Sequence, residues 1–158
     1  MNNNTDHIGN ETLHKAKATL DDLLAVSNDL SDGDLSDFYS MQSDRQPSDV
    51  FPNALDETTY TIKYGSRVLA VGGHGQGGVW FVTTNAVALL SKAGRFRFYR
   101  ILKAHLVWIK SEATGVTLTN WVSVGNHAHV RLLESLGATF QADCGISPAG
   151  FPFKQFWL

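Results

Sequence analysis

The sequence lacks most of the features that mark secreted, membrane-bound or cysteine-stabilised proteins. Its single cysteine, Cys144, excludes an internal disulfide and a cysteine-based zinc cluster, and we expect an ordinary, partly buried thiol. No stretch reaches the roughly 18 apolar residues of a membrane helix, and the polar start has no signal-peptide core. These absences favour a soluble, intracellular protein that binds no membrane.

Acidic residues are missing from the middle of the chain. No Asp or Glu occurs between Glu57 and Glu112. The first 57 residues carry twelve acidic residues against three basic ones, whereas residues 58–158 carry ten basic residues against three acidic ones. The two parts should attract each other, or either could present a charged surface to a partner. For the acidic part we favour the simpler interpretation, a solvated helical face.

The length and composition fit one domain. The chain has 158 residues, of which 43% are hydrophobic, and such a chain can build a core of its own. We therefore expect a single domain over residues 1–158. Residues 1–10 are polar and are expected to be disordered. Residues 42–57, which include Pro47 and Pro52, are expected to form a loop.

The hydrophobic pattern alternates between helical and extended segments. The expected strands are 13–18, 59–64, 67–71, 79–83, 117–124, 138–140 and 151–157. The expected helices are 20–30 after an N-cap at Thr19, 34–41, a short segment at 85–90, 95–111 after Gly94, and 127–136. This order predicts an α+β fold with a mixed, mostly antiparallel sheet flanked by helices.

Glycines and one asparagine punctuate this pattern. Gly65-Ser66 is typical of a two-residue hairpin turn. The segment 72–78 has the G-x-G-x-x-G spacing of a dinucleotide-binding loop, but no helix follows it. We interpret it as a flexible hairpin tip that carries an exposed His74. Asn126 is expected to cap the helix that follows, and Gly137 to end that helix in a left-handed conformation.

Several segments together resemble the GNAT (Gcn5-related N-acetyltransferase) superfamily. Residues 126–140 are similar to the part of that family in which strand five ends in Asn and the next helix ends in Leu-Gly-Phe, and residues 14–30 are similar to its first strand and helix. A narrower resemblance is to a phage family of GNAT-like proteins that includes the small internal virion protein of short-tailed phages. The segments that carry it are 80–84, 96–100, 120–122, 125–126 and 130–138.

The superfamily resemblance implies an acyl-CoA cleft where strands four and five diverge, with the pyrophosphate at the start of the next helix. Such a site needs glycines that let phosphates approach the backbone N–H groups. The nearest match here, residues 91–96, has one glycine and a bulky Phe96 where a small residue belongs. If acetyl-CoA binds, the implied residues are Lys92, Gly94, Arg95, Arg97 and Asn126.

The basic residues near the start of the helix expected at 95–111 are a second feature of this region. Arg95, Arg97, Arg100 and Lys103 oppose the helix dipole, which favours negative charge at that end. Phosphate binding, docking of the acidic first 57 residues and a simple solvated face all remain open.

Acetyl transfer also needs a base for the amine and usually an acid for the departing thiolate. The central strands offer no carboxylate, and the helix position where the family often has a Tyr acid is Leu133. Tyr99, His105 and His127 are the remaining candidates, together with His74. His127 and His129 without Cys or acidic neighbours do not predict a metal site.

We therefore favour a non-catalytic GNAT-like phage protein, a minor internal virion component or an assembly factor for the virion core or ejection machinery. This hypothesis places it in the virion interior or the host cytoplasm, with phage virion or assembly proteins as partners and no cofactor. The alternative is an acetyl-CoA-dependent N-acyltransferase that modifies an amine of a host or phage protein or small molecule. Nucleic-acid binding through residues 95–103 is less favoured, because their aromatic residues have the spacing of a core-facing helix stripe.

Overall fold

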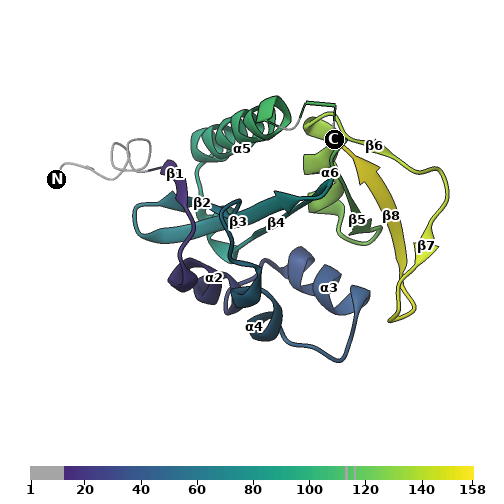
Figure 1. Ribbon diagram of the computed structural model, residues 1–158. Helices are drawn as coiled ribbons and strands as arrows, with labels where there is room; N and C mark the ends of the chain where they lie inside the picture. The colour runs from purple at the N-terminus through teal and green to yellow at the C-terminus, as the bar shows by residue number, and fades with distance from the viewer. Residues whose placement is uncertain (1–12, 113, 116) are drawn as a thin grey trace.

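A single mixed sheet forms the centre of the molecule, and two groups of helices cover its opposite faces (Figure 1). The computed structural model describes residues 13–112, 114–115 and 117–158. The strands are β1 Leu13–Lys17, β2 Tyr60–Tyr64, β3 Arg67–Gly75, β4 Gly78–Thr83, β5 Thr119–Ser123, β6 Thr139–Phe140, β7 Gly145–Ile146 and β8 Pro152–Trp157. Their order across the sheet is β1-β2-β3-β4-β5-β8-β6, with β7 also paired to β8. Among these strands β4 and β5 run parallel, and the other pairs are antiparallel.

The helices form two layers because each has one apolar stripe to bury. The α-helices are α2 Leu20–Ser27, α3 Asp32–Met41, α4 Pro47–Val50, α5 Lys92–Glu112 and α6 His127–Ser135, and the 3₁₀ helices are η1 Pro52–Ala54 and η2 Asn85–Leu89. α2 and α3 bury Leu23, Val26 and Phe38 against Val68 and Val71 of β3. α5 and α6 cover the other face, where the main buried residues are Phe98, Leu102, Leu106, Ile109 and Leu133. Burying a Leu or Phe side chain contributes about 1.5–3 kcal/mol, so each layer holds its helices firmly.

The caps expected for two helices are present. Thr19 and Asp22 form a reciprocal capping box at the start of α2. The Asp22 carboxylate also lies 2.7 Å from Nζ of Lys63 on β2. Burial alone would raise the pKa of Asp22, but the hydrogen bonds from Lys63 and Thr19 lower it. At the far end of α6, Gly137 has a φ of +89° and Ala138 N–H bonds back to Leu133 O, as in a Schellman cap.

Some boundaries differ from the sequence-based expectation. α5 begins at Lys92, because Ser91 Oγ accepts the Gly94 N–H at 3.0 Å and caps the helix earlier. β3 continues to Gly75, so the hairpin turn is only Gln76-Gly77, both with positive φ. The expected flexible tip at 72–78 is therefore mostly strand, and His74 is half-buried within it.

Other expectations were wrong in smaller ways. The segment 42–57 contains α4 and η1, which begin with Pro47 and Pro52 at helix positions that suit proline. The first helix ends at Ser27, and Leu30 instead bridges to Thr84. Cys144 is exposed, not partly buried. The expected disorder of residues 1–10 falls outside the described residues.

A close approach between β3 and β4 generates a stability prediction. A Cβ atom on Gly72 would lie 2.6 Å from Trp80 O and 2.8 Å from Phe81 Cβ, whereas a Cβ atom on Gly75 meets nothing within 4 Å. We expect Gly72→Ala to lower the free energy of unfolding by about 1–3 kcal/mol, as overpacking usually does. Gly75→Ala, the matched control in the same strand, should change it by less than about 0.5 kcal/mol. Urea denaturation measures both, and equal effects of the two substitutions would contradict this packing argument.

Candidate functional site

The sheet opens between β4 and β5. These strands share one bridging pair, Gly78 with Thr119, where Thr119 N–H donates to Gly77 O at 2.8 Å. Just beyond it, the Asn120 side chain donates to Val79 O at 2.8 Å, in place of a backbone partner. Towards their carboxyl ends the strands diverge, as the family resemblance implied. Backbone groups along both edges of the gap therefore need partners from elsewhere.

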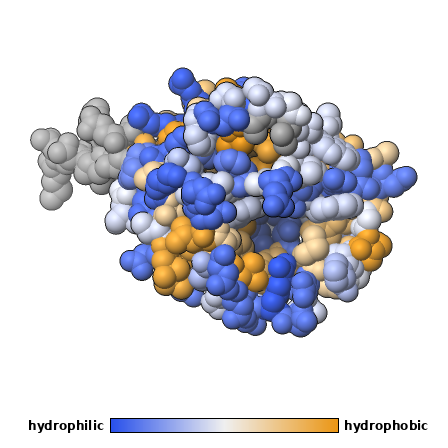
Figure 2. Space-filling model, in the orientation of Figure 1, coloured by the Kyte–Doolittle hydropathy of each residue, from blue (hydrophilic) through white to orange (hydrophobic). Residues whose placement is uncertain are grey.

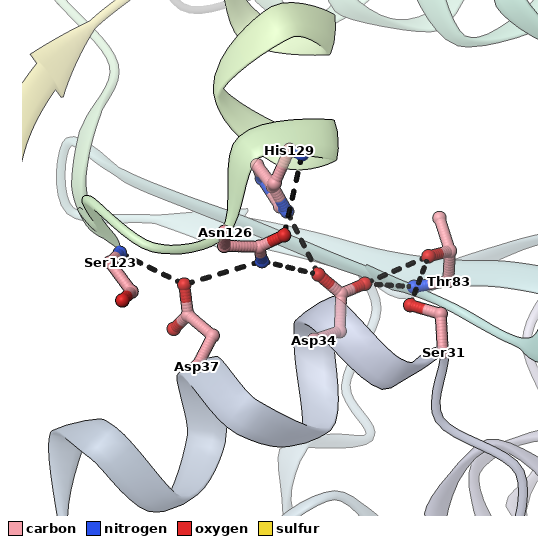
Figure 3. Close-up of polar contacts among 7 residues, drawn as sticks. All are labelled: Ser31, Asp34, Asp37, Thr83, Ser123, Asn126 and His129. Atoms are coloured by element: carbon pink, nitrogen blue, oxygen red, sulfur yellow. Dashed lines mark hydrogen bonds and ion pairs between the residues drawn. The ribbon is translucent and has the colours of Figure 1, made fainter.

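Two carboxylates of α3 provide those partners at the open end of the gap (Figure 3). Asp34 Oδ2 accepts both the backbone N–H of Thr83 at 2.7 Å and its hydroxyl at 2.8 Å. Asp37 Oδ2 accepts the backbone N–H of Ser123 at 2.9 Å. Asp34 and Asp37 are one helical turn apart, so one face of α3 holds the ends of β4 and β5 together.

The start of α6 joins the same group of side chains. Asn126 Nδ2 donates to Asp34 Oδ1 at 2.9 Å and lies 3.4 Å from Asp37 Oδ2, while its own oxygen accepts the His129 N–H. His129 Nδ1 lies 3.1 Å from Asp34 Oδ1. Ser31 Oγ lies 2.9 Å from the Thr83 hydroxyl oxygen. We refer to these residues as the cleft network; its members are Ser31, Asp34, Asp37, Thr83, Ser123, Asn126 and His129 (Figure 3). Gly33 permits this contact, since a Cβ there would lie 2.5 Å from Asn126 Oδ1.

The charges in the cleft network are strongly perturbed. Burial by itself would raise the pKa of Asp34, but the hydrogen bonds and charge of His129, with those of Thr83 and Asn126, outweigh it and lower the pKa to about 2. For Asp37 burial prevails over its hydrogen bonds and raises the pKa. Asp34 is therefore the ionised centre to which the surrounding donors point.

A cavity of about 390 Å³ lies beside the cleft network. Asp34, Asp37 and His129 contribute to its wall. Its apolar lining comes from the aromatic residues Phe38, Phe51, Trp80, Phe81, Trp121 and Phe156 and the aliphatic residues Met41, Val50, Ala54, Val79, Val82 and Val122. Figure 2 shows the corresponding hollow at the centre of this face. The His129 ring stacks on Phe81 with a centroid distance of 4.5 Å, which fixes its orientation.

Four of the residues implied for acyl-CoA gather at the start of α5, and the fifth does not. Lys92, Arg95 and Arg97 are exposed there, while Gly94 is buried with its N–H already accepted by Ser91. Arg95 Nε folds back onto Leu90 O at 3.2 Å. Asn126 lies in the cleft network instead, where it caps α6 as expected.

The candidate catalytic residues are not brought together. The Tyr99 hydroxyl donates to Ser135 O at 2.6 Å, between α5 and α6. His105 lies against β1, with Lys15 Nζ 3.1 Å from its Nδ1. Burial, helped by the nearby charges of Lys15 and His74, lowers the pKa of His105 to about 4. His127 is exposed at the first turn of α6, and Leu133 is fully buried.

Sequence reasoning missed the acidic part of this site. The acidic first part was interpreted as a solvated face, which is wrong for Asp22 and Asp34, both buried, and for the half-buried Asp37. The spacing of Asp34, Asp37 and Phe38 was the available signal, because it puts two carboxylates beside a core residue on one helix face. Within the described residues, no acidic side chain lies in ion-pair range of the basic cluster at Arg95–Lys103.

In the part of the chain that the structure describes, no group of three or more His, Cys, Asp or Glu side chains is arranged to hold a metal ion. No helix among the described residues is long and apolar enough to cross a membrane.

Known proteins resemble this chain in both sequence and fold. The family model described as "Bacteriophage T7, probable scaffold protein Gp13" matches residues 58–144. The probable scaffold protein gp13 of Escherichia phage T7 is 33% identical over 93 residues, which cover 59% of this chain and 64% of that protein, less than two thirds of its length.

Solved structures share the fold at low identity. A GNAT-family acetyltransferase from Bacillus anthracis superposes with a TM-score of 0.62 at 11% identity, covering 92% of this chain and 93% of the other. The ribosomal-protein-S18-alanine N-acetyltransferase of Escherichia coli gives 0.58 at 15% identity, covering 92% and 91%. The α+β, GNAT-like fold expected from the sequence is confirmed.

The cleft network generates a pH-dependent prediction. Because the pKa of Asp34 falls from 3.8 to about 2 on folding, its ionisation stabilises the fold above pH 4 and this contribution is lost as the pH falls towards 2. We expect Asp34→Asn to lower the free energy of unfolding by about 2 kcal/mol at pH 7, with a smaller difference from the unmodified chain near pH 2.

Denaturant unfolding between pH 7 and pH 2 measures this difference. Asp44→Asn is the matched control, because Asp44 is exposed, and it should change stability by less than about 0.5 kcal/mol. A deficit of Asp34→Asn that stays constant over the whole pH range would mean that the charge of Asp34 is not what stabilises the fold.

Proposed function

The chain belongs to the family described as Bacteriophage T7, probable scaffold protein Gp13, and from this we propose that it is a non-catalytic phage protein that acts in virion assembly. Its place of action would be the virion interior or the host cytoplasm. Its partners would be other virion or assembly proteins, bound through surface contacts. The GNAT-like fold would serve as a scaffold for those contacts rather than as an enzyme.

One observation carries the non-catalytic part of this proposal. The backbone N–H groups of Thr83 and Ser123, on the two diverging strands, are held by Asp34 and Asp37 of this chain's own α3. Carboxylates at the open end of the gap also repel the phosphates of a coenzyme. These hydrogen bonds occupy backbone donors at the ends of β4 and β5 that a cofactor would otherwise use.

The start of α5 supports the same conclusion. Pyrophosphate binding at a helix start needs free N–H groups and little side-chain bulk around them. Here the Gly94 N–H is capped by Ser91, and Gly94 itself packs against Leu90. The residues present do not fit acetyl-CoA, and we derive no reaction step from it.

One observation favours the alternative, an acyl-CoA-dependent N-acyltransferase. His129 is paired with Asp34 beside a cavity of about 390 Å³, and a carboxylate-oriented imidazole is a common general base. The ring could accept a proton from an amine in that cavity. This base was not among the candidates that the sequence suggested.

Acetyl-CoA binding separates the two functions. We expect no concentration-dependent rise in melting temperature on adding acetyl-CoA, whereas a ligand at about 100 times its Kd would stabilise the fold by about 2.7 kcal/mol. If saturable stabilisation occurs, and Arg95→Ala with Arg97→Ala removes it, the acyltransferase is favoured instead. Arg67→Ala with Arg131→Ala is the matched control, because both residues are exposed and lie on other elements, β3 and α6.

The assembly role is tested in particles of a phage that encodes this chain. Deleting the gene should reduce infectivity and alter the content of internal proteins in purified particles, as quantified by mass spectrometry. The unmodified chain and a Tyr99→Phe, His127→Ala, His129→Gln variant should restore both readouts equally. Particles of unchanged composition and infectivity would contradict an assembly role. Rescue by the unmodified chain alone would point to catalysis if the purified variant unfolds at the same denaturant concentration as the unmodified chain.

A further inference from the structure

The outer surface of α5 is strongly basic. Its exposed cations are Lys92, Arg95, Arg97, Arg100, Lys103 and Lys110, and its only acidic residue is Glu112 at the last position. Phe96 and Val107 are also exposed on this helix, at 64% and 60%, together with Trp108 at 40%. We call this surface the basic face. It combines uncompensated positive charge with exposed apolar side chains, of which Trp108 also packs against Tyr60 and His105.

Two cations of the basic face lie over aromatic rings. The Arg100 guanidinium lies 6.0 Å from the Phe96 ring centroid, and Lys103 Nζ lies 6.0 Å from that of Tyr99. Such contacts are worth about 0.5–1 kcal/mol when exposed, so they orient the cations without neutralising them. The positive charge remains available to an external partner.

The opposite surface has the complementary character. Residues 20–54, which form α2, α3, α4 and η1, contain a single Lys or Arg, Arg45. Their exposed acids are Asp21, Asp32, Asp44 and Asp49. Leu20, Leu24 and Leu35 are exposed among them, and Figure 2 shows hydrophobic side chains gathered over α2. We call this surface the acidic face.

The two faces cannot meet within one molecule. α5 covers one face of the sheet and α2, α3 and α4 cover the other, so the whole sheet separates them (Figure 1). Nor do described acids neutralise the basic face internally, because the two ion pairs join Lys63 to Asp22 and His129 to Asp34. A complementary surface for either face must therefore lie on another molecule.

We propose that copies of this chain associate head to tail, with the basic face of one copy on the acidic face of the next. The interface joins two different surfaces, so association continues into a ring or an open stack and does not stop at a two-fold dimer. The charges steer the encounter, and the exposed leucines and Phe96 provide the apolar contact at its centre. This inference goes beyond the assembly role and does not depend on whether the cleft binds acyl-CoA.

A nucleic acid fits these observations less well than a second copy. A polyanion would engage the basic face, but the acidic face would repel it, and the net charge of the chain is −2. A second copy uses both faces at once. It also accounts for exposed leucines on the acidic face, for which a nucleic acid offers no counterpart.

Sedimentation of the full-length chain at about 50 mM and about 500 mM salt tests the proposal, since screening shortens the reach of charge from about 14 Å to about 4 Å over this range. At low salt we expect the average mass to rise with protein concentration to at least about twice that of the monomer. At high salt it should return to the monomer value. A chain that stays monomeric at low salt would overturn the proposal.

Charge reversal identifies the faces. Arg100→Glu with Lys103→Glu on the basic face, or Asp21→Lys with Asp44→Lys on the acidic face, should each abolish association. An equimolar mixture of the two variants should associate again, which misfolding would not produce. The matched control for the basic face, Arg67→Glu with Arg131→Glu, makes the same change of charge as reversal of that face, on exposed residues outside both faces, and should associate like the unmodified chain.

Two results would overturn the proposal even if the chain self-associates. One is association that survives reversal of the basic face. The other is a mixture of the two reversed variants that stays monomeric. If the unmodified chain is monomeric but is retained on DNA at low salt, and reversal of the basic face removes that retention, the basic face is a nucleic-acid surface instead.

Discussion

The rest of this structure depends on the hydrogen bonds that the Asp34 carboxylate accepts. Two parallel strands that part at one end leave backbone donors without strand partners, and buried donors must be paired. Asp34 accepts from β4 and from α6, and one helical turn later Asp37 accepts from β5. α3, the strand ends and the start of α6 are thereby fixed relative to one another, although α3 and α6 lie on opposite faces of the sheet.

These hydrogen bonds bear on whether the cleft between β4 and β5 can bind a ligand. The family resemblance implied a ligand where the strands diverge, and here the protein's own side chains bond to the edges of both strands. The strands still diverge around a cavity of about 390 Å³, but carboxylates of α3 hold the ends of both strands. His129 illustrates how little separates a structural role from a catalytic one. Its ring is paired with the Asp34 carboxylate, as the imidazole of a general base often is.

Sequence reasoning recovered the fold well because local signals carry it. Thr19, Asn126 and Gly137 each act as the caps that their residue types indicate. It failed where tertiary contacts decide. Asp34 and Asp37 look like surface acids in a one-dimensional pattern, and only the packing of α3 over the strand gap buries them. Cys144 was misjudged for the same reason, since hydrophobicity alone does not say which loops the core covers.

The position of β8 in the sheet determines the order in which the strands can pair during synthesis. Its pairing partners β5, β6 and β7 all precede it in the chain, and it fills the place between β5 and β6. During synthesis the outer edge of β5 therefore stays unpaired until residue 157 has left the ribosome. The strands β1 to β4, which include the short hairpins β2–β3 and β3–β4, can pair as soon as β4 has been synthesised. The part of the sheet that contains β5, β6, β7 and β8 therefore forms last. Its unpaired edge is the point at which incomplete chains would aggregate.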